Sequence, residues 1–105
     1  MVYVNFTLDL TSEDYKKLLT QGQFIRVGDV LVANAQGSSF VAVSRLCTHE
    51  NGNLSYRLTQ NDFLCDKHGG LFNINGSVKA APPTRAVKAY NTSLSADGIK
   101  LTVTA

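Results

Sequence analysis

All the cysteine and histidine in this chain falls into two short segments, and this clustering constrains the fold more than any other feature. Cys47 and His49 form the first segment, Cys65 and His68 form the second, and fifteen residues separate His49 from Cys65. A chain of 105 residues buries only a small core and often needs a disulfide or a metal to stabilise it. One disulfide would leave the two histidines unexplained, whereas a metal centre accounts for all four side chains. We therefore expect two loops that hold metal together.

Turn residues divide the rest of the chain into short strand candidates, a pattern typical of an all-β fold. Asn75-Gly76 is the strongest hairpin signal, and Gly28-Asp29, Gln60-Asn61 and Asp97-Gly98 mark further turns. We expect roughly nine strands in stacked antiparallel sheets or a small barrel, with both ligand segments in loops that follow strands and all of residues 1–105 in one domain. The candidate strands are 3–8, 24–27, 30–34, 40–44, 54–58, 62–64, 71–73, 77–79, 86–94 and 99–103.

One short helix is expected near the N-terminus, over Glu13 to Leu19. Thr11 or Ser12 could cap its first turn, where acidic residues also favour the helix dipole. Gly22 would end it.

Composition and charge exclude several functions. The net charge is +2, from 10 basic and 8 acidic residues, and the basic residues are scattered, which disfavours nucleic-acid binding. No apolar run is long enough to span a membrane, and no signal peptide pattern is visible. A leader could have been removed, so the compartment stays open. Asp29, Asp62 and Asp97 stand in turn contexts where aspartate serves backbone geometry, so we predict no catalytic acid, base or nucleophile.

Thiolate and imidazole ligands together suit zinc, iron or copper. Structural zinc sites often pair cysteine with cysteine and histidine with histidine, whereas each segment here brings one of each. In a two-iron cluster, one iron can take both thiolates and the other both imidazoles. A zinc-stapled binding module remains the alternative, and metal analysis would distinguish the two.

The order Cys-x-His, fifteen residues, then Cys-x-x-His-Gly resembles the signature of Rieske iron–sulfur proteins. The resemblance covers about residues 24–103 and implies one [2Fe-2S] cluster. It assigns Cys47 and Cys65 to the buried iron, and His49 and His68 to the outer iron. Phe72 and Gly76 stand where the family has an aromatic residue and a turn glycine, and Ala81-Pro82-Pro83 resembles the proline loop that covers the cluster.

Departures from the family pattern imply a low reduction potential. Asp66 replaces the usual proline and adds a carboxylate near the cluster. Gly52 and Lys67 stand where respiratory members carry the two cysteines of an inter-loop disulfide. Gly70 and Phe72 stand where those members carry a serine and a tyrosine that donate hydrogen bonds to the cluster and its ligand. Fewer such bonds stabilise the reduced cluster less, so we predict roughly −150 mV rather than +300 mV.

The function expected from this resemblance is ferredoxin-like one-electron transfer between a reductase and a terminal oxidoreductase or oxygenase. The chain by itself is not expected to be an oxygenase, since both histidines are committed and a mononuclear iron site needs two more. The protein would be the electron-transfer component of an oxidoreductase system, with redox proteins as partners. The alternatives are the soluble domain of a membrane-anchored, extracytoplasmic Rieske carrier and the zinc-stapled module.

Overall fold

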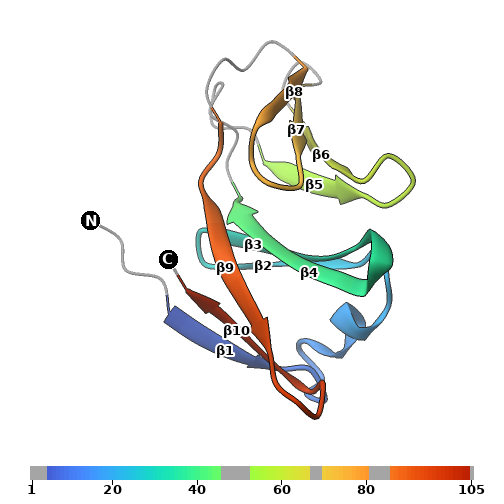
Figure 1. Cartoon of the computed structure of the whole chain (residues 1–105), viewed down its shortest axis with the longest axis vertical. Coiled ribbons are helices and arrows are strands. Elements are labelled where there is room, and N and C mark those ends of the chain that lie inside the picture. Colours follow the sequence, from blue (N-terminus) through green and yellow to red (C-terminus); the bar gives the residue numbers. More distant parts are fainter. Residues whose placement is uncertain (1–4, 46–52, 67–69, 81–85, 105) are drawn as a thin grey trace.

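Ten strands form two antiparallel sheets in the part of the chain that the computed structural model describes, residues 5–45, 53–66, 70–80 and 86–104 (Figure 1). A six-stranded sheet has the order β1-β10-β9-β4-β3-β2, and a four-stranded sheet has the order β5-β6-β7-β8. The strands are β1 (Asn5–Asp9), β2 (Phe24–Val27), β3 (Val30–Ala35), β4 (Ser39–Ser44), β5 (Leu54–Arg57), β6 (Asp62–Cys65), β7 (Leu71–Asn73), β8 (Val78–Ala80), β9 (Ala89–Leu94) and β10 (Lys100–Thr104).

The strand β3 is buried along its whole length because both of its faces are covered. Val30 and Val32 face one apolar cluster, which they share with residues of β1, β4, β10 and the segment before β2. Leu31, Ala33 and Ala35 alternate with them and face a second cluster between the two sheets. The apolar run of β3 in the sequence is thus the signature of a strand with a hydrophobic layer on each side.

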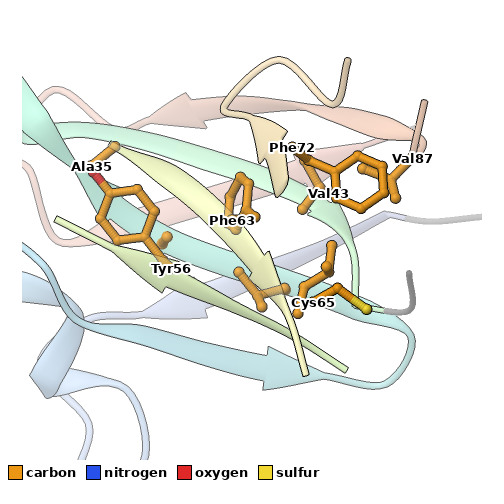
Figure 2. Packing of buried hydrophobic residues seen from close by; sticks show 10 residues of the cluster. Ala35, Val43, Tyr56, Phe63, Cys65, Phe72 and Val87 are labelled. Carbon is orange, nitrogen blue, oxygen red and sulfur yellow. The ribbon is translucent and has the colours of Figure 1, made fainter. Parts of the chain in front are cut away.

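The four-stranded sheet packs on β3 and β4 through that second cluster, and it lies at one end of the molecule (Figure 1). Tyr56, Phe63 and Phe72 are the aromatic members of this cluster, and the rings of Tyr56 and Phe63 meet edge to face with centroids 5.6 Å apart. Figure 2 shows this cluster running from Ala35 and Tyr56 at one end to Cys65 and Val87 at the other.

Polar contacts fix the orientation of the two sheets. The Tyr56 hydroxyl donates to Asn61 Oδ1 at 2.6 Å and accepts from the Gln36 backbone N–H at 3.1 Å. The Gln36 side-chain amide donates to the Leu58 carbonyl at 2.7 Å. Burial raises the pKa of Tyr56, so its hydroxyl stays protonated and keeps its proton for Asn61. The β5–β6 hairpin is therefore joined to the end of β3 by directional bonds as well as by packing.

The structure confirms the all-β expectation and the predicted turns. Gly28, Asn61, Gly76 and Gly98 each adopt a positive φ in the loops between paired strands. The ends of several strands differ from the prediction by one to three residues; the strand expected from Ala86, for example, begins at Ala89.

The predicted helix over Glu13 to Leu19 is wrong in type and length. A single 3-10 turn spans Lys16–Leu19, and no side chain caps it. The Ser12 hydroxyl instead donates to the Asp9 carbonyl at 2.7 Å. So short a segment gains too few hydrogen bonds to offset helix nucleation. A second 3-10 turn, Gln36–Ser38, precedes β4, where the sequence predicts a turn. No helix in the described ranges is long and apolar enough to cross a membrane.

Candidate metal centre

Cys65 is the expected ligand that the structure describes, and it lies at the end of β6. The residue is 1 % exposed and packs in the cluster between the sheets, while Figure 2 shows its sulfur at the edge of that cluster, directed away from Phe63. The other expected ligands, Cys47, His49 and His68, lie outside the described residues, as does the proline segment 81–85. The site is therefore defined by Cys65 and by the described residues that flank these segments.

Residues 67–69, which contain the expected ligand His68, lie between two residues joined through the backbone. The Cys65 N–H donates to the Gly70 carbonyl at 2.8 Å, which continues the ladder between β6 and β7 by one rung beyond Leu64 and Leu71. Gly70 is buried. The ladder thus fixes the backbone of Cys65 at the point where the chain leaves the sheet, and a fixed backbone limits the directions that the thiol can take.

Residues 46–52, with the expected ligands Cys47 and His49, also lie between described residues that are joined. The Leu54 N–H donates to the Arg45 carbonyl at 2.9 Å. The Arg26 guanidinium, on edge strand β2, donates to the Leu54 carbonyl at 2.9 Å. Leu54 is paired with Cys65 across the β5–β6 ladder. The flanks of the two ligand segments therefore belong to one hydrogen-bonded structure.

Asn53 and Asp66 make a further connection between these flanks. The Asp66 N–H donates to the Asn53 carbonyl at 3.0 Å, and the Asn53 N–H donates to Asp66 Oδ1 at 2.9 Å. Asn53 directly follows residues 46–52, and Asp66 directly precedes residues 67–69. From the sequence, Asp66 was expected only to add a negative charge near the cluster. The structure shows in addition that its carboxylate accepts a hydrogen bond from the Asn53 backbone.

Gly76 is hydrogen-bonded to Val87, the second described residue after residues 81–85. The Val87 N–H donates to the Gly76 carbonyl at 2.9 Å, and Val87 is buried in the same cluster as Cys65 and Phe72. A Cβ placed on Gly76 would lie 2.5 Å from the Val87 carbonyl oxygen, so the close approach requires glycine. Val87, which follows residues 81–85, and Cys65, which precedes residues 67–69, thus lie at the same end of the cluster in Figure 2.

Asp62 does not serve turn geometry as expected from the sequence; it is a fully buried member of an ion triad on the four-stranded sheet. Arg57 on β5 contacts it with two nitrogens, Nε to Oδ1 at 2.8 Å and Nη2 to Oδ2 at 2.7 Å. Lys79 on β8 donates to Oδ2 at 2.8 Å. Hydrogen bonds from Arg57 above all, and then from Lys79, hold the pKa of Asp62 below its ordinary value. The triad thus links β5, β6 and β8 of the sheet whose strand β6 ends at Cys65.

Several other aromatic and acidic residues have structural roles. Phe72 is fully buried in the core, and Phe6, Phe24, Phe40 and Tyr90 pack against the two clusters. Asp97 organises the turn between β9 and β10, where its Oδ1 accepts from the Ser95 hydroxyl and from the Ile99 N–H. None of these residues adds a proton-transfer group beside Cys65.

Comparison with known proteins identifies a matching family and similar sequences and structures. A family model described as Rieske [2Fe-2S] domain matches residues 3–91. The iron-sulfur subunit of the cytochrome b6-f complex from Chlorobaculum thiosulfatiphilum is 29% identical over 70 residues, which are 67% of this chain. The chain spans only 38% of the length of that subunit.

Two solved structures are similar over most of the chain. The ferredoxin of carbazole 1,9a-dioxygenase from Nocardioides aromaticivorans IC177 is 25% identical with a TM-score of 0.72, covering 99% of this chain and 98% of that one. A chain in the complex of reduced oxygenase and oxidized ferredoxin of carbazole 1,9a-dioxygenase is 27% identical with a TM-score of 0.66, covering 79% of this chain and 90% of that one.

Proposed function

Since this chain belongs to the Rieske [2Fe-2S] domain family, in which one [2Fe-2S] cluster transfers electrons, we propose that it is a ferredoxin-type carrier between a reductase and a terminal oxidoreductase or oxygenase. The cluster, when bound, accepts and releases a single electron. The carrier role is supported above all by similarity over almost the entire length to a dioxygenase ferredoxin. The complex between an oxygenase and its ferredoxin is the model for the partner class.

The ligands in this proposal are Cys47 and Cys65 on one iron and His49 and His68 on the other. The donor set fits the cluster because two thiolates and two imidazoles are what a Rieske centre takes. Cys65 supports the assignment by its position, with its sulfur at the edge of the core next to the flanks of the other ligand segments. We also propose that residues 1–105 act as one domain, since the cluster-bearing sheet shares its core with β3 and β4.

Each part of the chain then has a limited task. The backbone bonds of Cys65 to Gly70 and of Leu54 to Arg45 fix the described residues that flank the two ligand segments. The buried aromatic residues behind Cys65 exclude water from the inner side of the site and so lower the local dielectric constant. The imidazoles of His49 and His68 would lie on the outer side and give electrons a short path to a partner.

Replacement of Cys65 tests the ligand assignment. Loss of a group that merely supports a ligand costs a metal site 10- to 100-fold in affinity, so Cys65→Ser is expected to lower bound iron by at least about tenfold. Iron would be assayed on purified protein, with Leu64→Ser as the control because it places the same side chain on the neighbouring position of β6. Full iron content in Cys65→Ser would refute the assignment.

The reduction potential tests the carrier role. Gly70 and Phe72 carry no hydroxyl that could donate to the cluster, so a redox titration is expected to give roughly −150 mV. The similarity to a cytochrome b6-f subunit favours a second candidate, the electron-carrying domain of a membrane-anchored, quinol-oxidising system. A potential near roughly +300 mV would support that candidate and contradict the ferredoxin.

A further inference from the structure

We propose that Asp66 is a positioning residue whose carboxylate ties the two ligand segments together, so that the geometry of the cluster depends on it. The inference rests on the proposed ligands, and it concerns residues that the structure describes. The chain has two cysteines, both of them proposed ligands, so no disulfide can join the segments. Hydrogen bonds between the residues that flank them are therefore the connection available in the described part of the chain.

The register of the four-stranded sheet explains why a side-chain acceptor is needed at Asp66. Leu54 and Cys65 face each other on β5 and β6, so Asn53 and Asp66 are the next pair along the ladder. In an antiparallel ladder every second pair exchanges two backbone hydrogen bonds. The Cys65 N–H donates to Gly70 on the β7 side, so the Asn53–Asp66 pair is the one expected to exchange two bonds. The first bond is present, from the Asp66 N–H to the Asn53 carbonyl at 3.0 Å. For the second, the Asn53 N–H donates to the side-chain oxygen Oδ1 of Asp66 at 2.9 Å.

The carboxylate therefore supplies the acceptor as the chain at Asp66 turns out of the sheet. An ionised acceptor makes a stronger hydrogen bond than a neutral one. The bond joins the last described residue before 67–69 to the first described residue after 46–52. Its loss would leave only one bond in this pair, and the two ligand segments could then move apart more easily.

The neighbouring contacts show that the Asn53–Asp66 pair connects the flanks of the two ligand segments. Cys65 is bonded to Gly70 on the β7 side, and Leu54 is bonded to Arg45 on its other side. Each of those bonds joins the two flanks of a single ligand segment. The Asn53–Asp66 pair instead joins one segment to the other beyond the last paired residues of β5 and β6, and its carboxylate bond is the one that a single side chain controls.

Two substitutions separate the tether from the charge. Asp66→Asn keeps an Oδ1 that can accept from the Asn53 N–H but removes the negative charge, whereas Asp66→Ala removes both. Asp97→Ala is the matched control, because Asp97 Oδ1 also accepts a backbone N–H, that of Ile99 at 3.2 Å. Asp97 lies in the turn at the end of the molecule opposite the four-stranded sheet (Figure 1).

The experiment measures cluster loss in the presence of an iron chelator and amide hydrogen exchange of the peptide containing Asn53. Loss of a hydrogen bond to a charged group is expected to make Asp66→Ala lose its cluster about five- to tenfold faster and exchange the Asn53 amide faster. The EPR lines of the reduced protein should broaden as the ligand geometry becomes less uniform. Asp66→Asn should restore most of the lifetime, the exchange protection and the line width that Asp66→Ala loses, because its amide oxygen still accepts from the Asn53 N–H. Its potential should rise as it does in Asp66→Ala, because both variants lack the negative charge.

The outcomes distinguish this inference from the proposed function. Wild-type protein that carries no iron–sulfur cluster would contradict the proposed function, whatever the variants do. Wild-type protein with its cluster, but with Asp66→Ala losing iron no faster than Asp97→Ala, would overturn the tether. So would equal rates of loss in Asp66→Asn and Asp66→Ala, because charge alone would then explain the effect.

Discussion

Replacing Asp62 with alanine is expected to lower the free energy of unfolding by about 3 kcal/mol. The carboxylate is fully buried and accepts three hydrogen bonds from Arg57 and Lys79. Removing one member of a buried ion pair leaves its partners uncompensated and opens a cavity. The two cations are 31% and 39% exposed, so they can turn toward water, which keeps the cost at the lower end of the usual range.

Chemical denaturation of Asp62→Ala would be compared with Asp14→Ala, which removes an exposed carboxylate and should change stability by less than about 0.5 kcal/mol. The pH dependence gives a second check, with Asp62→Asn. The pKa of Asp62 is lower in the folded protein than its ordinary value of 3.8. Ionisation of Asp62 therefore stabilises the folded protein at any pH above that ordinary pKa. That stabilisation is lost as the pH falls through the folded pKa. The stability difference between wild type and Asp62→Asn should therefore narrow below about pH 4; a difference independent of pH would contradict the triad.

Replacing Gly76 with alanine is expected to cost roughly 3 kcal/mol, more than the same change at Gly98. Both glycines have a positive φ, +93° and +76°, so alanine is strained at either position. A Cβ on Gly98 meets nothing within 4 Å, whereas one on Gly76 would lie 2.5 Å from the Val87 carbonyl oxygen. Backbone strain alone should make Gly98→Ala cost about 1 kcal/mol.

The difference between the two variants measures the close approach of Val87 to the turn. Relief of the overlap must separate Val87 from Gly76 and break their 2.9 Å backbone hydrogen bond. Val87 and Cys65 pack in the same hydrophobic core cluster. The [2Fe-2S] cluster should therefore also be lost faster from Gly76→Ala than from Gly98→Ala. Equal unfolding free energies for the two variants, from urea titrations, would show that the contact with Val87 contributes nothing.

The features that the sequence predicted well are local. Asn75-Gly76 and Asp97-Gly98 mark hairpins because glycine adopts a positive φ without strain, and both turns are found. The ligand spacing indicated the family because four side chains in a fixed order are a specific pattern, and the family match confirms the resemblance. The helix failed because acidic residues and a serine at positions 12–14 also suit a succession of turns, which needs no helix nucleus.

The features that the sequence did not predict depend on pairing between distant residues. Asp62 follows Asn61 in what reads as a turn, and its partner Lys79 lies seventeen residues away. Only the strand order β5-β6-β7-β8 brings the two side chains together. Asp66 likewise meets Asn53 through the β5–β6 register, thirteen residues apart. The available signal was the presence of two acidic residues close to the expected ligand Cys65 in the sequence. Their partners could be identified only from the strand pairing of the sheet.

The most direct test of the account is EPR spectroscopy and visible absorption of the purified wild-type protein before and after dithionite, with iron and zinc assayed on the same sample. We expect a red-brown protein with two iron atoms per chain. Its reduced form should give an EPR signal with an average g value below that of all-cysteine [2Fe-2S] clusters, as two histidine ligands on one iron require. A colourless protein with one zinc and no EPR signal would contradict it.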